Sequence, residues 1–441
     1  MDEKSLISRK YKAGNFLIFT CTFLYAALMT AKGIFTAEIA ELIIVFGTDK
    51  PTASLASTYY FLTYASVQII MTLFMGKMDM KKYLSITIPL SAVCTAIMGL
   101  ATKIEHMWIV FSINGVFQAG MWGGIVYTIT RYLPPSMLAK GNTIVNAGYA
   151  LGNVLAYALS ALFVSFNLWR LPFFIAGALS LLAIILYIIS VNNSVKYQDV
   201  PDVRNSQPTT EKKKRIGRPK DKDADQPMII LDGKKKRVVF YIIDMFMSFL
   251  LTAPYYMIMN WLPNSLIENH GFSNDVAIYI SIIAPIVTLI GPTLTISSCD
   301  KVKNFVKPAL FYSLMMLPMP LLLALLYKVH FLIVIVLSVA CLALTNGIKA
   351  ITLSVVSIKL RTQINSGMIG TLNNATASVA AAVVPTIIGA IIESAGWQAS
   401  YFVTFGASLA ICLALVIILA LVKIDNSKNN TGRESKCLKT Y

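Results

Sequence analysis

Residues 14–40 read GNFLIFTCTFLYAALMTAKGIFTAEIA, a nearly unbroken apolar run with a lysine at position 32. A helix needs about 20 apolar residues to cross a bilayer, and this run is long enough. A lysine near the centre of a membrane costs about 2.5–3.5 kcal/mol. The stretch therefore predicts a transmembrane helix in which Lys32 has either an acidic partner or a function that requires its charge.

The composition indicates a membrane protein with many spans. Of the 441 residues, 56% are hydrophobic and only 13% are charged, whereas about 25% of residues are charged in a soluble globular protein. The chain begins with the polar segment MDEKSLISRKYK, and the first apolar run is too long for the core of a cleavable signal peptide. We therefore expect that run to remain as the first transmembrane helix.

Apolar segments of spanning length recur along the chain, which predicts an all-α membrane protein. Polar segments separate them, and the weakest breaks are the short gaps at 103–107 and 328–330. Twelve spans are predicted, near residues 15–40, 53–75, 83–102, 107–130, 142–166, 170–191, 238–262, 274–297, 305–327, 330–356, 366–392 and 398–423.

The distribution of basic residues predicts the orientation. Lysine and arginine concentrate in both terminal segments and in every second loop, and such segments stay in the cytoplasm. We therefore expect a multi-pass protein, of the cell or plasma membrane, with both termini cytoplasmic. A long polar loop divides the spans six and six. The predicted parts are a bundle at 1–191, a basic disordered loop at 192–237, a second bundle at 238–423 and a cytoplasmic tail at 424–441.

The net charge of +17 raises the question of nucleic-acid binding. Much of this charge lies in the 192–237 loop, where the tetrapeptide GRPK resembles the core of an AT-hook. A basic cytoplasmic loop held near anionic lipid explains the same residues. We expect the lipid bilayer to be a partner of this chain, and nucleic acid not to be one.

The reactive residue types are scattered. Six cysteines occur singly, mostly within apolar spans, and are interpreted as packing residues, not disulfides or metal ligands. The three histidines all lie in predicted loops. A phosphate-binding glycine loop, a catalytic triad and a metal cluster are all absent from the sequence. We therefore expect no cofactor, no metal and no enzymatic activity.

The two predicted bundles resemble one another. NLWRLPFFIAGALSL at 167–181 precedes the sixth span and AGWQASYFVTFGASL at 395–409 precedes the twelfth, and both contain a tryptophan, an aromatic pair and a glycine. MGKMDMKK after the second span mirrors SSCDKVK after the eighth, so that Asp79 and Asp300 each lie among lysines. Repeated halves around a central site are typical of transporters.

These features resemble the major facilitator superfamily, whose fold has two six-helix pseudo-repeats around a central cavity. That family carries G-x-x-x-D-[RK] after the second and eighth spans. Gly76 and Asp79 form a first copy that is one residue short, and Asp300 with Lys301 forms a nearer second copy. The resemblance implies that Gly76, Asp79, Asp300 and Lys301 control conformational gating at the cytoplasmic face.

A closer resemblance is to the organophosphate:phosphate antiporters, which include glycerol-3-phosphate and hexose-phosphate exchangers. GVFQAGMWGG resembles their G-x-F-Q-x-x-x-W stretch, YAALMTAKGIF their first helix and NWLPNSL their D-W-x-P-x-x-L. Arginines of the first and seventh helices clamp phosphate in that family. This chain has Lys32 and Tyr255 at those positions, and Tyr149 where a histidine is expected. A lysine is a point charge and lacks the fork of arginine, so a carboxylate substrate competes with a phosphate ester.

A second lysine, Lys349, lies in the predicted tenth span within LALTNGIKAITLSVV, with no acid within ten residues. Thr345, Asn346 and Thr352 share its helical face. Helices one, four, seven and ten line the cavity in the resembled fold, so both lysines are expected to face it. The alternatives are that Lys32 pairs with Glu38 or Glu41 or extends to the interface, and that Lys349 pairs with a carboxylate of another helix. The expected substrate-binding residues are Lys32, Lys349, Tyr25, Gln118, Trp122, Tyr149, Tyr255 and Asn346.

The sequence thus predicts a monomeric secondary transporter of a small organic anion, an organophosphate or a carboxylate, that works by alternating access. Binding of the anion would neutralise the lysines and favour movement of the loaded carrier, which is the basis of anion exchange. Proton-coupled symport of the same solutes is one alternative, because a buried lysine can also carry a proton. A transporter-like sensor that binds its ligand without flux is another.

Overall fold

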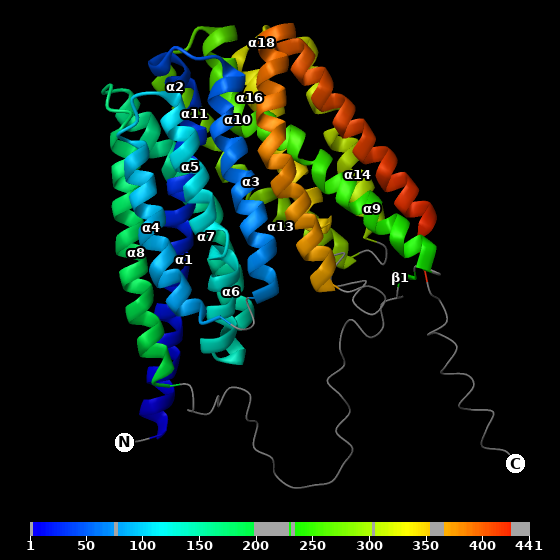
Figure 1. The fold of residues 1–441 in the computed structure, drawn as a ribbon. Helices are drawn as coiled ribbons and strands as arrows, with labels where there is room; N and C mark the ends of the chain where they lie inside the picture. Colours follow the sequence, from blue (N-terminus) through cyan, green and yellow to red (C-terminus); the bar gives the residue numbers. More distant parts are fainter. Residues whose placement is uncertain are drawn as a thin grey trace, which may run out of the picture.

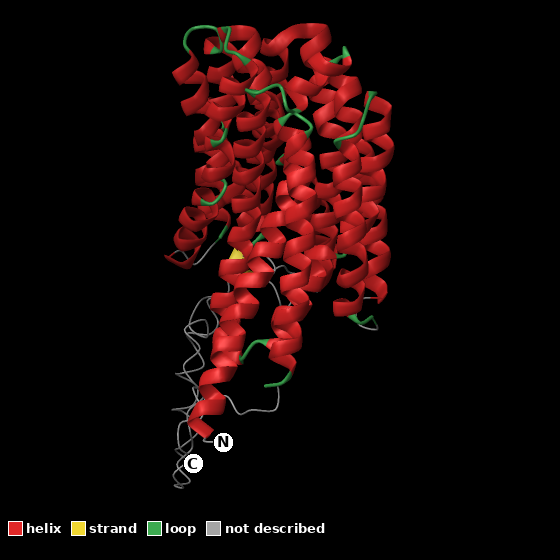
Figure 2. Ribbon diagram, turned by 90° about the vertical axis from the view of Figure 1, so that its left-hand side faces the viewer, coloured by secondary structure: helices red, strands yellow, loops and turns green. Residues whose placement is uncertain are grey.

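The computed structural model contains long helices that run side by side (Figures 1 and 2), as the apolar segments predict. Their backbone polar groups bond within each helix, which a membrane interior requires. The structure describes residues 3–74, 78–197, 229–230, 234–301, 305–352 and 366–424.

The amino-terminal half consists of the helices that precede the long loop. A short 3-10 turn at Pro135–Met137 precedes its α7 helix. Its helices are α1 (Glu3–Ala37), α2 (Ile39–Phe46), α3 (Lys50–Phe74), α4 (Met80–Met98), α5 (Ile104–Gln118), α6 (Met121–Tyr132), α7 (Leu138–Val164) and α8 (Leu171–Val195).

The carboxy-terminal half follows the loop. Two-residue strands, β1 (Ile229–Ile230) and β2 (Lys423–Ile424), pair antiparallel at its edge. Its helices are α9 (Lys234–Leu250), α10 (Thr252–His270), α11 (Asn274–Ser281), α12 (Ile283–Val287), α13 (Ile290–Lys301), α14 (Val306–Met316), α15 (Pro318–Leu326), α16 (Phe331–Ala350) and α18 (Ser366–Leu421).

The described helices account for the twelve predicted spans. Nine stretches are long and apolar enough to cross a membrane. The last of them, 373–421, contains Gly396 in the left-handed region and is therefore two spans joined at a kink. The helices α3 and α4 are the remaining two spans and lie in the same bundle (Figure 1). The weak breaks also occur as expected, at the turns before α5 and before α16.

The two halves contact each other mainly at one end. We call the end where α1 begins and α18 ends the terminal end, and the opposite end the distal end (Figure 1). One buried cluster includes side chains of both halves, such as Phe35 and Tyr157 with Trp261 and Leu266. A second cluster, from Leu17 to Val191, contains only described residues of the amino-terminal half. The described halves are therefore packed together at the distal end and diverge toward the terminal end (Figure 1).

The sequence similarity between the halves has a structural counterpart. A residue with positive φ precedes the last span of each half: Asn167 with φ 58° before α8, and Gly396 with φ 82° at the kink inside α18. In each half a buried tryptophan then contacts an aromatic ring four residues later. The ring centroids are 6.4 Å apart for Trp169 and Phe173, and 6.3 Å apart for Trp397 and Tyr401. The two segments thus share the aromatic contact, although the positive-φ residue lies two positions before Trp169 and one position before Trp397.

Candidate functional site

Lys32 lies on α1 and its ammonium group faces aromatic rings. Its Nζ atom is 4.5 Å from the centroid of the Phe61 ring and 5.7 Å from that of the Tyr60 ring, both on α3. No carboxylate of the described residues forms an ion pair with Lys32. The electron-rich faces of the rings partly replace water around the charge. Pairing of Lys32 with Glu38 or Glu41 therefore does not occur in this conformation.

Lys349 lies on α16 in the other half and has a similar environment. Its Nζ atom is 5.3 Å from the centroid of the Tyr255 ring on α10. Within the described part of the chain it also has no ion pair. Asp244 of α9, a buried acid of the same half, instead accepts a hydrogen bond of 2.6 Å from the Asn373 amide. Lys32 and Lys349 are close enough to repel one another.

Aromatic rings connect the two lysines across the halves. The Phe61 ring, below Lys32, lies 6.0 Å from the Tyr256 ring of α10. Tyr256 in turn lies 5.0 Å from Tyr255, the ring below Lys349. These edge-to-face contacts suit the charge distribution of aromatic rings. Two positive charges from different halves thus lie on one continuous aromatic surface.

The remaining aromatic residues of the expected site also lie together. The Tyr149 hydroxyl on α7 is 2.9 Å from the Tyr255 hydroxyl, a hydrogen bond between the halves. The Tyr25 ring on α1 is 4.9 Å from the Trp122 ring on α6 and 6.2 Å from the Tyr149 ring. Tyr25, Trp122, Tyr149 and Tyr255 therefore form one cluster with Lys349.

Two other expected residues have local partners. Gln118 is fully buried within the amino-terminal half, where its Oε1 atom accepts a hydrogen bond of 2.8 Å from Tyr60 and its amide donates to Ser91 at 3.0 Å. Gln118 forms no hydrogen bond with Lys32, but it holds the hydroxyl of Tyr60, whose ring lies near the Lys32 ammonium group. Asn346 is half-buried, and its amide donates to Leu342 one turn earlier in the same helix. Its carbonyl oxygen and its second amide hydrogen can still bind a ligand.

The sequence analysis missed the aromatic residues that contact the lysines. Tyr60, Phe61 and Tyr256 were not among the expected site residues, although they contact or connect the two ammonium groups. The sequence feature that could have identified them is a run of adjacent aromatic residues, in TYYFL at 58–62 and in PYYM at 254–257. Helices two and seven of the predicted order carry them. Helix periodicity alone does not identify which neighbouring helix such residues face.

At the distal end, charged and hydroxyl groups join the halves. The Lys50 ammonium at the start of α3 lies 2.8 Å from Glu268 of α10 and 3.2 Å from Glu393 of α18. The Trp397 indole also donates to Glu268, at 2.9 Å. Thr58 of α3 is 2.9 Å from Thr386 of α18. These contacts close the distal end.

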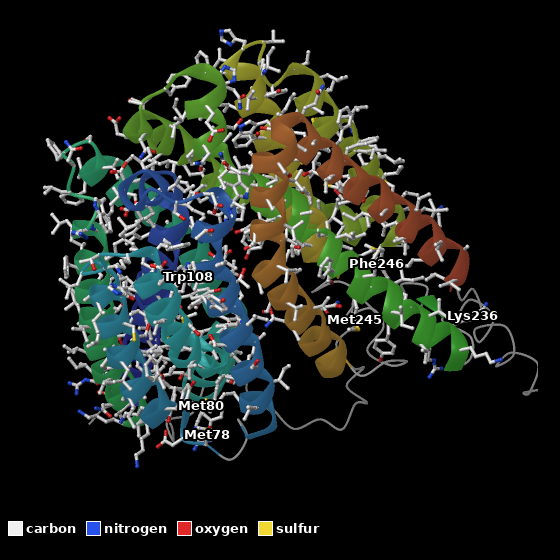
Figure 3. All side chains as sticks on the ribbon, turned by 45° about the horizontal axis from the view of Figure 1, so that its top comes forward. Met78, Met80, Trp108, Lys236, Met245 and Phe246 are labelled. Carbon is white, nitrogen blue, oxygen red and sulfur yellow. The ribbon has the colours of Figure 1, made fainter. Side chains whose placement is uncertain are left out.

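Within the amino-terminal half, Trp108 (Figure 3) connects two helices at the distal end. The indole of this α5 residue donates to the Thr52 carbonyl of α3 at 3.1 Å. The start of α3, which carries Lys50, is thereby fixed to α5.

The expected gating residues that the structure describes lie at the terminal end (Figure 1). Asp79, between Met78 and Met80 (Figure 3), caps α4 by accepting from the backbone amides of Lys81 and Lys82. This is an ordinary N-cap interaction. Gly76 lies outside the described residues, and Asp300 and Lys301 are the last two residues of α13. A gating role for these four residues remains a prediction.

Comparison with known proteins gives the family. A family model described as the Major Facilitator Superfamily matches residues 14–363. A probable hexose phosphate transport protein of Chlamydia trachomatis is 20% identical over 183 residues, which are 41% of this chain and 40% of the relative. A benzoate transport protein of Acinetobacter baylyi is 27% identical over 97 residues, 22% of this chain and 21% of the relative. The chain thus matches less than half the length of each relative.

Solved structures show the fold. A D-xylose-proton symporter superposes with a TM-score of 0.69 at 15% identity, covering 93% of this chain and 97% of that chain. The Escherichia coli xylose transporter XylE, in a partially occluded inward-open conformation, gives a TM-score of 0.67 at 13% identity, covering 91% and 97%. At these identities the likeness concerns the fold alone, and it confirms the expected all-α transporter architecture.

Proposed function

Because the chain belongs to the major facilitator superfamily, we propose that it is a secondary transporter that moves a small organic anion by alternating access. The observation that carries this proposal is the pair Lys32 and Lys349. Each half contributes one lysine, neither is ion-paired among the described residues, and aromatic rings connect them. An anion bound between them supplies the missing negative charge. A transporter family also supports the expectation that the chain is not an enzyme.

Each residue of the cluster has a proposed role in binding. The lysines bind the carboxylate or phosphate group, and the rings of Tyr25, Trp122 and Tyr255 pack against the rest of the substrate. The Tyr149 and Tyr255 hydroxyls, which bond to each other at 2.9 Å, exchange that bond for bonds to the substrate. Gln118 acts as a positioning residue, because it holds the Tyr60 hydroxyl beside Lys32.

The same cluster explains why the loaded carrier would move more readily. An empty site leaves two like charges facing each other, and closing it removes water from both, which costs several kcal/mol per ion. A bound anion pairs with both charges and lowers this cost. The described conformation, joined at the distal end through Lys50 and Glu268, corresponds to one of the two end states. Exchange of one anion for another is the simplest transport mode that follows.

The substrate class follows from the charge of the site. Two point charges favour a phosphate monoester or a dicarboxylate over a singly charged acid, whereas the aromatic surface favours a substrate with an apolar or ring-shaped body. The relatives are named for hexose phosphate and for benzoate. Glucose 6-phosphate and benzoate are therefore the first two probes. Proton-coupled symport is a second candidate, favoured by the buried carboxyl group of Glu38.

The test is binding of radiolabelled glucose 6-phosphate and benzoate to purified Lys32→Gln and Lys349→Gln proteins. Losing a hydrogen bond to a charged group costs about 1.5–3 kcal/mol. Each variant should therefore bind roughly 10- to 150-fold more weakly. Lys32→Arg should retain more affinity than Lys32→Gln. The matched control is Lys103→Gln, since Lys103 is exposed at the start of α5 and makes no side-chain cap.

Monodisperse gel filtration in detergent establishes that the variants are folded. If both folded Gln variants bind the probes as wild type does, the lysines are structural and the anion assignment is wrong. Counterflow of the bound probe in liposomes then separates a transporter from a sensor, because a sensor binds without flux.

A further inference from the structure

Glu38 is a buried acidic residue directly after the first span, and its carboxyl group has no hydrogen bond to any described residue. It occupies the turn between α1 and α2 and is fully buried. Neither carboxyl oxygen has a hydrogen-bond partner among the described residues. The Ser160 hydroxyl of α7 faces the carboxyl group and is itself without a bond. A buried polar group without partners is rare, because each one costs free energy in the folded state.

Among the described residues, no positively charged group forms an ion pair with Glu38. On its own segment, Lys32 lies over aromatic rings, and Glu41 of α2 accepts a bond from Asn274. Glu41 is a second acid close to Glu38, and a negative charge on it would oppose ionisation of Glu38. Most charged and titratable groups on the neighbouring helices bond to other partners: Lys50 to Glu268 and Glu393, Arg170 to the Ala101 carbonyl, Tyr157 to the Met259 carbonyl, and Tyr60 to Gln118. His270, at the end of α10, makes no hydrogen bond to Glu38, and its buried Nε2 atom has no hydrogen-bond partner among the described residues.

Among the described residues, only the Ser160 hydroxyl faces an ionised Glu38 carboxylate, and one neutral hydroxyl does not replace the lost water. The cost of burying such a charge is several kcal/mol even after the protein relaxes. The neutral acid avoids most of that cost and can still donate to or accept from the Ser160 hydroxyl. We infer that Glu38 is a proton-binding site, neutral while the distal end is closed and ionised when that end opens.

Contacts between the halves connect this site to distal closure. Tyr157 lies one turn before Ser160 on α7, and its hydroxyl donates to the Met259 carbonyl of α10 in the other half. Three residues after Glu38, Glu41 accepts from Asn274, at the start of α11. The segments on both sides of the carboxyl group therefore separate from the other half when the distal end opens. Separation admits water, which stabilises the carboxylate.

Linkage then couples proton binding to conformation. The carboxylate takes one proton from water at the open distal end, and the resulting neutral acid favours closure. Loss of that proton favours opening to the same extent, because coupling of two equilibria is reciprocal. This inference rests on the proposed transport function for its alternating conformations, but its test needs no substrate.

The experiment measures distal closure by the reactivity of a cysteine introduced as Thr386→Cys. Thr386 contacts Thr58 of the other half, so the thiol becomes more accessible when the distal end opens. The protein is reconstituted in liposomes and exposed from the distal side to a membrane-impermeant maleimide over a range of pH. Protein without this cysteine gives the background. Labelling of the reporter should rise several-fold as pH increases. Glu38→Gln, which mimics the neutral acid, should keep labelling low at all pH values. Glu105→Gln, at an exposed acid in the first turn of α5, is the control and should respond to pH as the reporter protein does.

An infrared titration supplies a second measurement on the same proteins. The carbonyl stretch of the protonated Glu38 carboxyl group should disappear with rising pH in wild type and Glu105→Gln, and should be missing from Glu38→Gln. The inference is overturned if Glu38→Gln retains the pH response of the reporter, or if wild type has neither the band nor the response. Failure of glucose 6-phosphate and benzoate to move, with the pH response intact, would count against the transport proposal alone.

Discussion

The Lys50 ammonium lies 2.8 Å from a carboxyl oxygen of Glu268, so the first residue of α3 is tied to the last turn of α10. The same ammonium reaches Glu393 of α18 at 3.2 Å. One lysine of the amino-terminal half thus holds two helices of the other half. Its side chain is 12% exposed, and the two acids are 39% and 48% exposed. The interaction is therefore only partly screened by water.

Replacing Lys50 should weaken distal closure. Ion pairs of this exposure are worth about 0.2–1 kcal/mol each. Lys50→Met, which keeps the apolar stem, should therefore shift the equilibrium toward the distal-open state by a few-fold. Spin–spin distance distributions between labels at distal positions of α5 and α11 measure the shift. Lys103→Met is the control. An unchanged distribution would mean that apolar packing alone holds this end.

The hydroxyl pair of Tyr149 and Tyr255 should behave as one interaction. Each Tyr→Phe change removes the same hydrogen bond and should cost about 0.5–1.5 kcal/mol. The double variant should then lose little more than either single variant, because the two residues are in contact. Thermal unfolding in detergent for the four proteins of the cycle gives the coupling. Strictly additive shifts would show that the two hydroxyls act through separate partners.

Two glycines should be indispensable for helix packing. A Cβ at Gly152 would lie 2.3 Å from the Ala26 carbonyl oxygen, and one at Gly291 would lie 1.9 Å from the Ala343 carbonyl oxygen. Neither backbone can move away without separating two helices, α1 from α7 or α13 from α16. Overpacking typically costs about 1–3 kcal/mol, occasionally more. We expect Gly152→Ala and Gly291→Ala to aggregate or to melt earlier.

The control for these glycines lies in the last span. A Cβ at Gly406 meets nothing within 4 Å, so Gly406→Ala should have a gel-filtration profile and a melting temperature close to wild type. A Gly152→Ala protein that is monodisperse and as heat-stable as wild type would contradict the close approach of α1 and α7.

The terminal end is predicted to be cytoplasmic, because basic residues concentrate there. A cysteine at Glu105, exposed near the start of α5, should react with a membrane-impermeant maleimide added to intact cells. A cysteine at Lys196, exposed after α8, should react only after the cells are permeabilised. The reverse pattern would invert the predicted orientation and, with it, the side to which the described conformation opens.

The sequence was sufficient for the helices because each span carries its own signal. Apolar length predicted the spans, and polar breaks predicted the turns before α5 and α16, where Lys103 and His330 begin the next helix. The similarity of the segments containing Trp169 and Trp397 also appears in the fold. These features depend on residues that are near one another in the chain.

Contacts between distant segments could not be predicted in the same way. The position of Lys32 above Phe61 depends on how α1 and α3 are rotated against each other, and the spacing of apolar residues fixes neither rotation. Lys50 lies between the first two predicted spans, and its spacing in the sequence gives no sign of its ion pairs with residues more than 200 positions away. Glu38 was considered as a partner for Lys32, whereas the turn after α1 separates them.

Lys32 and Lys349 also have an electrical consequence. Moving one elementary charge through the whole membrane potential does about 2.3 kcal/mol of work per 100 mV. If the rocking of the halves carries these lysines through part of that field, an empty carrier transfers positive charge. A bound dianion cancels that charge, and a monoanion leaves half of it. The valence of the cargo therefore decides whether the cell's voltage drives, opposes or ignores the turnover of this protein.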